Sequence, residues 1–384
     1  MYEIPHLGAA YQPIEDYALI GDLYTVALVG KNGSIDWCCL PDFDSASVFG
    51  ALLDAQKGGF FRIAPSETLG MQYRQLYVPE TNILITRFLS LNGVAEMTDF
   101  MPLRQSGSSS HRHMIIRSVK VVRGSLTFEM LCRPAFNYAC DPHTTQVSRE
   151  GAVFHSKHLS LALAASVPLE HDAHEGARAE FTLQSGQSAR FFLEGAQEYD
   201  LAPSHFSDGY YYELLQQTLN YWRNWLAHCQ YQGRWREMVQ RSALVLKLLT
   251  YAPTGAIVAA PTTSLPETLG GTRNWDYRYT WLRDASFTLY SLLILGLTQE
   301  AEAFMGWLDL RCHEMEADGA LQPIYGIRGE HDVPESILDH LEGYCQSRPV
   351  RIGNATSRQL QLDIYGELMD AVYLSNRHAP IPYV

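Results

Sequence analysis

The stretch VALVGKNGSIDWCCL, residues 26–40, decides the fold of the first half of the chain. Asn32-Gly33 lies between two runs of strand-forming residues, which is typical of a two-residue β-hairpin turn. Asn92-Gly93 repeats the pattern between ILITRFLSL and VAEMTDF. HMIIRSVKVV is expected to turn at Arg123-Gly124 into SLTFEMLC, and LSLALAASV, AEFTLQ and ARFFLEG continue as short strands. Residues 1–206 are therefore predicted to form an antiparallel β-sandwich.

The hydrophobic period changes near Ser207, from two residues to the spacing of a helix. SDGYYYELLQQTLNYWRNWLAHC predicts a linker helix within residues 207–230, with Ser207 as its N-cap. Four more helices are expected in RWREMVQRSALVLKLLT, in TWLRDASFTLYSLLILG ending at Gly296, in TQEAEAFMGWLDLRCHEM with Thr298 as N-cap, and after Asn354. The fold class is thus multidomain α+β, with a helical toroid or bundle over residues 231–384.

Composition and charge exclude several classes of protein. The chain has 384 residues, 46% of them hydrophobic, and a net charge of −13 without basic runs, which argues against nucleic acid and anionic membranes as partners. The N-terminal residues lack a signal peptide and no segment has the length of a membrane helix, so a cytoplasmic location is predicted. Seven scattered cysteines without a CxxC pair suggest core thiols and neither a disulfide framework nor a zinc site.

The stretch NWDYRYTWLRDAS, residues 274–286, carries the chemistry, because the usual nucleotide, acyl-transfer and zinc-protease motifs do not occur in the sequence. A carboxylate can accept hydrogen bonds from two vicinal hydroxyls of a hexose, a guanidinium can donate to them, and aromatic rings pack on the C–H face of the sugar. Asp284, Arg283, Trp281 and Tyr277 supply these functions. The alternative is a helix N-terminus with an acidic first turn and an intrahelical arginine.

The chain also resembles glycoside hydrolase family 15, which includes glucoamylases, glucodextranases and bacterial trehalases. IEDYALIGDLYTVALVGKNGSIDWCCLPDFDSASVFGALLD is similar to the start of a trehalase-like N-terminal β-domain. RSALVLKLLTYAPTGAIVAAPTTSLPETLGGTRNWDYRYTWLRDASFTLYSLLILG and HLEGYCQSRPVRIGNATSRQLQLDIYGELMDAVYL are similar to the opening part of an (α/α)6 catalytic barrel. The resemblance implies that Arg283 and Asp284 bind the non-reducing-end glucose in the −1 subsite, with Tyr277 and Trp281 lining it. Thr280 stands where bacterial relatives often have cysteine, and this difference is expected to have no effect.

The resemblance assigns substrate binding more loosely to Arg348 and Arg351, in SRPVRIGN. Family members invert: a glutamic acid protonates the glycosidic oxygen and a glutamate activates water, about 6.5–9.5 Å apart. The motifs that carry these residues in the family, of the types GIWE and GLLSEE, do not occur in the 384 residues. No catalytic residue is therefore assigned, and the general acid and base are expected beyond residue 384. Three glutamates of the loop GEHDVPESILDHLEGY are interpreted as rim charges: Glu330, Glu335 and Glu342.

These expectations describe an exo-acting α-glucoside hydrolase of trehalase or glucoamylase type, incomplete and inactive as this chain alone. The expected ligand is an α-glucoside such as trehalose or an α-glucan oligosaccharide. Acid–base hydrolysis implies no cofactor and no metal, although the resemblance leaves open a dependence on phosphate and magnesium. An incomplete barrel would expose apolar helix faces and favour self-association. The alternatives are a non-catalytic carbohydrate-binding or regulatory protein, and a structural module in which the Arg-Asp pair serves packing.

Overall fold

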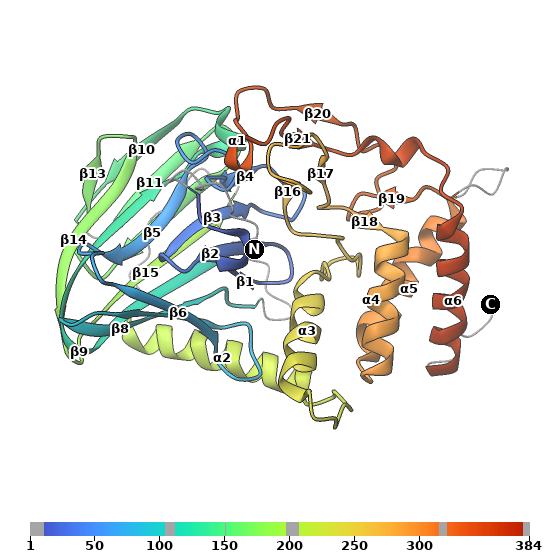
Figure 1. Cartoon of the computed structure of the whole chain (residues 1–384), viewed down its shortest axis with the longest axis horizontal. Coiled ribbons are helices and arrows are strands. Elements are labelled where there is room, and N and C mark those ends of the chain that lie inside the picture. Colours follow the sequence, from blue (N-terminus) through green and yellow to red (C-terminus); the bar gives the residue numbers. More distant parts are fainter. Residues whose placement is uncertain (1–10, 104–111, 150, 197–206, 315–320, 379–384) are drawn as a thin grey trace, which may run out of the picture. The chain divides into compact units, whose positions relative to one another are not determined.

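The computed structural model describes residues 11–103, 112–149, 151–196, 207–314 and 321–378 (Figure 1). The chain divides into two compact units, Met1–Trp222 and Arg223–Val384. Among the described residues no helix has the length and apolar character needed to cross a membrane.

The first unit is built on one large antiparallel sheet, which confirms the antiparallel β-structure of the prediction, while the sandwich arrangement stays a prediction. Its strands are β1 Tyr17–Gly21, β2 Val26–Gly30, β3 Ser34–Cys39, β4 Ser47–Phe49, β5 Phe60–Pro65, β6 Gln72–Tyr77, β7 Leu84–Leu89, β8 Gly93–Phe100, β9 His113–Arg133, β10 His143–Val147, β11 Gly151–Ser156, β12 Ser160–Ala165, β13 Glu170–Asp172, β14 Gly176–Gln184 and β15 Ser188–Ala196. Two short helical turns accompany them: η1 Ile14–Asp16 and α1 Phe136–Ala139.

Both predicted NG hairpins form. Residues 31–33 connect β2 to β3 as a three-residue turn, whereas in the second hairpin Ser90 N bonds to Gly93 O at 3.0 Å, which leaves Leu91 and Asn92 as a two-residue turn. The first is closed by a hydrogen bond from Gly33 N to Gly30 O of 2.9 Å. Three-residue connections with glycine near their end are the next most common hairpin class.

The predicted turn at Arg123-Gly124 is wrong, because β9 continues through it for 21 residues. Gly124 has a φ of +78°, and a Cβ there would lie 2.0 Å from Asn92 O, so the glycine produces an irregularity inside a strand and not a reversal. The first half of β9 pairs with β8 and β15, and the second half pairs with β5 and β14. The strand therefore joins the two halves of the sheet around one hydrophobic core.

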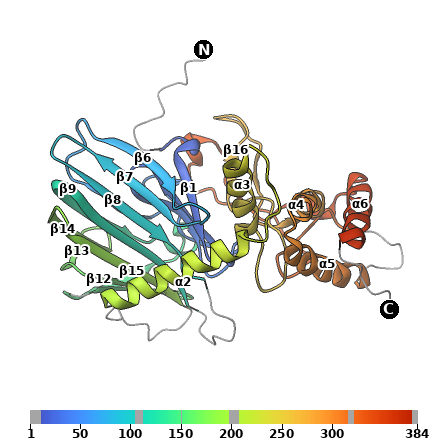
Figure 2. The ribbon, with the colours of Figure 1, turned by 90° about the horizontal axis from the view of Figure 1, so that it is seen from below.

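A buried ion pair crosses this core. Arg117 Nε donates to Asp99 Oδ1 at 2.9 Å, and Arg117 Nη2 donates to Gly33 O at 2.8 Å, with both side chains fully buried. Figure 2 shows α2, Asp208–Leu226, lying across the sheet, where Tyr211 packs on Phe100. Ser207 Oγ accepts from Tyr210 N at 3.2 Å, so the predicted N-cap is confirmed.

The second unit, called the helical unit below, contains the helices that the sequence predicts. They are α3 Arg236–Leu248, α4 Leu282–Ile294, α5 Thr298–His313 and α6 Asp363–His378. Short strands and turns connect them: β16 Thr263–Pro266, β17 Asn274–Asp276, β18 Thr280–Trp281, β19 Ile324–Tyr325, β20 Ser336–Ile337, η2 Tyr344–Gln346, β21 Arg351–Ile352 and η3 Ala355–Arg358. Whether the helices belong to a toroid stays a prediction.

The end of α4 was predicted correctly, and the N-cap of α5 was not. Gly296, with a φ of +80°, follows α4, and Leu297 N bonds to Leu292 O while Gly296 N bonds to Leu293 O, which is a Schellman motif. Thr298, predicted to cap α5, is instead its first residue; Leu297 occupies the cap position without a side-chain hydrogen bond. The C-terminal end of the preceding helix thus fixes the start of the next one.

The cysteines also depart from one expectation. Cys38, Cys39 and Cys132 are buried, as core thiols should be, and burial raises the pKa of the Cys132 thiol. Cys229, Cys312 and Cys345 are only half-buried, and Cys140 is exposed, so the interpretation as a core thiol is wrong for Cys140. It follows the short turn α1 at the edge of the sheet, where polar residues surround it in the sequence.

Candidate functional site

The site is built on residues 274–281, where buried and half-buried residues alternate strictly. Four polar side chains point inward with no exposed surface: Asn274, Asp276, Arg278 and Thr280. Four aromatic side chains between them are only half-buried: Trp275, Tyr277, Tyr279 and Trp281. This inverts the usual distribution of polar and aromatic residues. Half-buried aromatic rings can pack on the apolar face of a ligand, and the polar groups beside them can bind its hydroxyls.

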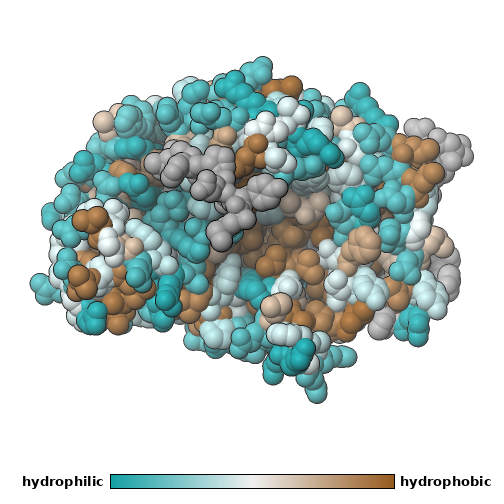
Figure 3. Space-filling model, in the orientation of Figure 1, coloured by the Kyte–Doolittle hydropathy of each residue, from teal (hydrophilic) through white to brown (hydrophobic). Residues whose placement is uncertain are grey.

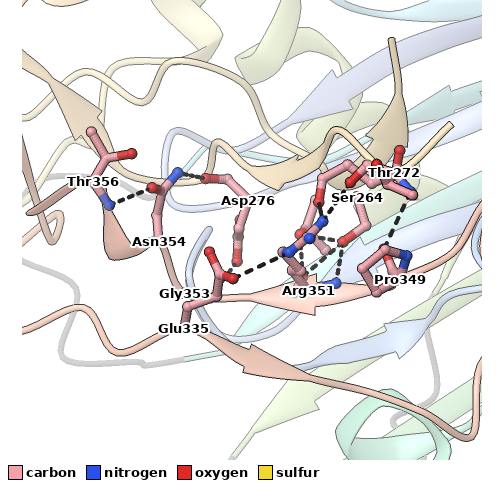
Figure 4. Close-up of polar contacts among 11 residues, drawn as sticks. Ser264, Thr272, Asp276, Glu335, Pro349, Arg351, Gly353, Asn354 and Thr356 are labelled. Carbon is pink, nitrogen blue, oxygen red and sulfur yellow. Dashed lines mark hydrogen bonds and ion pairs between the residues drawn. The ribbon is translucent and has the colours of Figure 1, made fainter. Parts of the chain in front are cut away.

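The inner side is a hydrogen-bond network around Asp276 (Figure 4). Asp276 accepts from Arg278 Nε at 2.9 Å, from Arg278 Nη2 at 2.6 Å and from Gly353 N at 3.1 Å. Asn354 Nδ2 donates to the backbone oxygen of Asp276 at 3.0 Å. The network therefore fixes β17 to the segment that follows β21, about 77 residues away along the chain.

Thr280 is the weak point of the inner side. Its side chain is fully buried, and within the described part of the chain its hydroxyl oxygen makes no hydrogen bond. A buried hydroxyl without a partner is destabilising. The expectation that threonine in place of cysteine has no effect stays a prediction, and the stability of a Thr280→Cys variant tests it.

The outer side brings together the four residues singled out in the sequence. The rings of Tyr277 and Trp281 stack with centroids 6.0 Å apart and an angle of 28° between their planes. The guanidinium of Arg283 lies 5.1 Å from the centre of the Trp281 ring. Arg283 Nη2 contacts Asp284 Oδ2 at 3.1 Å. Two rings, a cation and a carboxylate thus lie next to one another between Tyr277 and the first turn of α4.

Two residues that the sequence analysis did not assign complete this surface. Asp363 Oδ2 lies 3.1 Å from Arg283 Nη1, and Gln361 Oε1 accepts from Trp281 Nε1 at 3.2 Å. Asp363 is the first residue of α6 and Gln361 precedes the helix by two residues, about 80 residues after Arg283 and Trp281 in the sequence. They belong to the QLQLDIYGEL segment, but nothing in its spacing showed that it would meet the Arg-Asp pair.

Charge and partial burial modify the ionisable groups of the surface. Burial raises the pKa of Tyr277, and the nearby carboxylates of Glu267 and Asp284 raise it further. Desolvation lowers the pKa of Arg283, but hydrogen bonding to Asp363 and the charge of Asp284 outweigh it, so its pKa is raised. The side chains of Asp284 and Asp363 are 42% and 44% exposed. Both carboxylates therefore keep accessible surface for a polar ligand.

The two arginines of SRPVRIGN have different surroundings. The Arg351 side chain is 14% exposed and is bound to Glu335 Oε1 at 3.1 Å and to Thr272 O at 2.9 Å (Figure 4). It also lies over the Trp275 ring at 4.4 Å. Arg348 is exposed. Arg351 therefore holds the inner framework together, with Nε and Nη1 bound to protein oxygens.

The rim glutamates also differ from one another. Glu335 is paired with Arg351, and Glu330 is an exposed partner of Arg328 at 3.7 Å. Glu342 is half-buried. Among the residues whose placement is described, no group of three or more His, Cys, Asp or Glu side chains could hold a metal ion.

Comparison with known proteins gives two family matches. Residues 233–380 match the family "Glycosyl hydrolases family 15", and residues 6–188 match the family "Trehalase-like, N-terminal". A trehalase of Thermoplasma volcanium is 37% identical over 366 residues, covering 94% of this chain and 57% of that protein. A trehalase of Mycolicibacterium smegmatis is 36% identical over 394 residues, covering 96% and 58%. Trehalase 1 of Sulfolobus acidocaldarius is 36% identical over 358 residues, covering 92% and 58%.

The chain thus spans somewhat more than half the length of these curated relatives. Among solved structures, a family GH92 alpha-mannosidase from Bacteroides thetaiotaomicron aligns at 12% identity, covering 86% of this chain and 53% of that chain. Its TM-score of 0.31 is too low to indicate a shared fold.

Proposed function

Residues 233–380 belong to glycosyl hydrolase family 15 and residues 6–188 are a trehalase-like N-terminal domain, and we propose that this chain supplies the glucose-binding surface of an inverting, exo-acting α-glucoside hydrolase. The observation that carries the proposal is the outer surface of residues 277–284, with two stacked rings beside an Arg-Asp pair. The surface consists of groups that a hexose can use on its apolar face and on its hydroxyl edge.

Each group has a definite task in this proposal. Tyr277 and Trp281 pack on the C–H face of the non-reducing-end glucose. Asp284 accepts hydrogen bonds from two vicinal hydroxyls, and Arg283 donates with those of its five N–H groups that Asp284 and Asp363 leave open. The resemblance adds Arg348 as a substrate contact, and its exposure is compatible with that role. Arg351 is a weaker candidate, because its guanidinium is bound to protein groups.

Trehalose is the favoured substrate over a longer α-glucan, since the similar curated proteins are trehalases. Inversion requires an acid and a base about 6.5–9.5 Å apart with water between them. The proposal assigns sugar binding alone and no acid or base within the 384 residues, because the family's glutamate motifs do not occur in them. The chain by itself is therefore expected to bind trehalose without hydrolysing it.

The domain organisation belongs to the same proposal. We place a β-domain at residues 1–206, a linker helix at 207–230 and part of an (α/α)6 toroid at 231–384. The apolar residues that α4 exposes support contacts with further helices: Phe287, Tyr290 and Ile294 are 55%, 44% and 57% exposed. Figure 3 shows apolar side chains at the surface over the helices on the right of the view.

The test is proton NMR of the 384-residue chain with trehalose and with maltotriose, followed for glucose release. The expected result is line broadening of the trehalose signals without new glucose signals. Early β-glucose would contradict the assignment of sugar binding alone, because it would show a complete inverting pair in this chain.

A non-catalytic carbohydrate-binding or regulatory protein is the second candidate, favoured by the same surface without the catalytic motifs. The two differ in what they bind best, because a hydrolase subsite is complementary to the oxocarbenium-like transition state. Protonated 1-deoxynojirimycin should bind at least about tenfold more tightly than glucose if the surface is a hydrolase subsite. Equal affinities would favour the binding protein.

A further inference from the structure

Two contacts tie the proposed glucose-binding surface to the start of α6. Arg283 Nη1 lies 3.1 Å from Asp363 Oδ2, and Trp281 Nε1 donates to Gln361 Oε1 at 3.2 Å. Arg283 and Trp281 are also in contact with each other, with the guanidinium 5.1 Å from the ring centre. The cation and the ring that would meet the sugar are therefore each held by a residue of one short segment.

We infer that Asp363 and Gln361 are positioning residues for the sugar, which keep the Arg283 guanidinium and the Trp281 ring in their binding orientation. This inference rests on the proposed function. Neither residue is assigned a sugar contact; each acts through its partner on β18 or α4.

Asp363 acts through the way in which Arg283 shares its N–H groups between two carboxylates. Arg283 contacts only Oδ2 of Asp284, and its other terminal nitrogen is directed to Asp363. Without Asp363, the guanidinium could turn to Asp284 with both nitrogens, because a planar fork and a carboxylate favour two parallel hydrogen bonds. That arrangement would occupy both oxygens of Asp284, which must accept from the sugar hydroxyls. Asp363 thus keeps Asp284 available.

Gln361 acts on the orientation of the Trp281 indole. A ring that stacks on a sugar binds more tightly when its orientation is fixed beforehand, because less side-chain entropy is lost on binding. The side-chain oxygen of Gln361 fixes the indole N–H, and Tyr277 stacks on the ring. A leucine at position 361 would keep the volume and remove the acceptor.

Stability alone does not explain the Asp363 contact. The side chains of Arg283 and Asp363 are 36% and 44% exposed, and ion pairs between such groups add little to the free energy of folding. Asp363 lies in the first turn of α6, where a negative charge favours the helix. A purely structural role would therefore appear in the melting temperature and not in the geometry of Arg283 or Trp281.

The test uses the full 384-residue chain and two measurements on each variant. Calorimetry gives the dissociation constant for trehalose, and a ¹H–¹⁵N spectrum gives the indole N–H resonance of Trp281, assigned by its loss in Trp281→Phe. Asp363→Ala and Asp363→Asn are expected to weaken binding about tenfold, the size of one lost charge-assisted hydrogen bond. Gln361→Leu should move the Trp281 resonance and weaken binding. Asp370→Asn, an exposed residue of the same helix, should change neither.

The outcomes separate this inference from the proposed function. If the wild-type chain does not bind trehalose, both are overturned. If it binds, and Asp284→Ala abolishes binding while folded Asp363→Asn and Gln361→Leu bind like the wild type, the inference alone is overturned. A folded Asp363→Asn variant with tenfold weaker binding, together with a moved Trp281 resonance in Gln361→Leu, supports it.

Discussion

Replacing Asp276 by alanine is expected to destabilise the helical unit by about 3–5 kcal/mol, because it breaks a fully buried ion pair. The Arg278 side chain is 1% exposed and donates to Asp276 with Nε and Nη2 at 2.9 and 2.6 Å. Both side chains are buried, so the alanine variant leaves the Arg278 guanidinium without its carboxylate in the protein interior. Gly353 N also loses its acceptor at 3.1 Å, which places the expected cost toward the upper end of the range.

Urea unfolding followed by tryptophan fluorescence measures this cost, because most tryptophans lie in the helical unit. Five of the seven are found there: Trp225, Trp235, Trp275, Trp281 and Trp307. Asp276→Asn should cost less, since its amide oxygen still accepts hydrogen bonds. Asp370→Ala, an exposed residue of α6, should stay within about 0.5 kcal/mol of the wild type. A loss below about 1 kcal/mol for Asp276→Ala would refute the reasoning that the buried network supports the aromatic surface.

Three further predictions concern other parts of the helical unit. The hydrogen bond from Arg311 lowers the pKa of Glu314 from 4.5 to about 2. The stability that Glu314 contributes is therefore present above pH 4.5 and lost as the pH falls toward 2. Glu314→Gln should make the midpoint of urea unfolding depend less on pH between these two values. Thr280→Cys should stabilise the unit by about 1–3 kcal/mol in the same urea assay, and an unchanged urea midpoint would contradict a destabilising role of the buried hydroxyl. The exposed apolar face of α4 should make the chain self-associate. Phe287→Ser should raise the monomer fraction measured by light scattering after gel filtration. An unchanged oligomer would exclude this face as the contact.

The sequence predicted the elements better than their connections. Local signals identified the strands around Asn32-Gly33 and the end of α4 at Gly296, because both depend on residues close in the chain. The same kind of signal at Gly124 was misleading, since a glycine with positive φ serves an irregular strand as well as a turn. Only the partners of β9 distinguish the two cases, and these lie far away in the sequence.

The candidate site also combines contacts between residues close in the sequence, which could be predicted, with contacts between distant residues, which could not. Tyr277, Trp281, Arg283 and Asp284 lie within eight positions of the sequence, and the structure brings each into contact with the next. Their contacts with Asp363 and Gln361 join positions about 80 residues apart, which no local pattern encodes.

Arg348 and Arg351 lie three positions apart in SRPVRIGN, and the resemblance assigned both to substrate binding. The structure separates them by burial, because Arg351 is bound to Glu335 and covers Trp275. The tertiary environment, and not the motif, therefore decides which arginine is available to a ligand.

The most direct test of the central claim, that residues 277–284 bind glucose, is calorimetric titration of the 384-residue chain and its Asp284→Ala variant with trehalose. We expect saturable binding by the wild type and loss of binding in the variant, with both proteins equally folded by circular dichroism. Equal affinity of the two proteins, or no binding by the wild type, would contradict it.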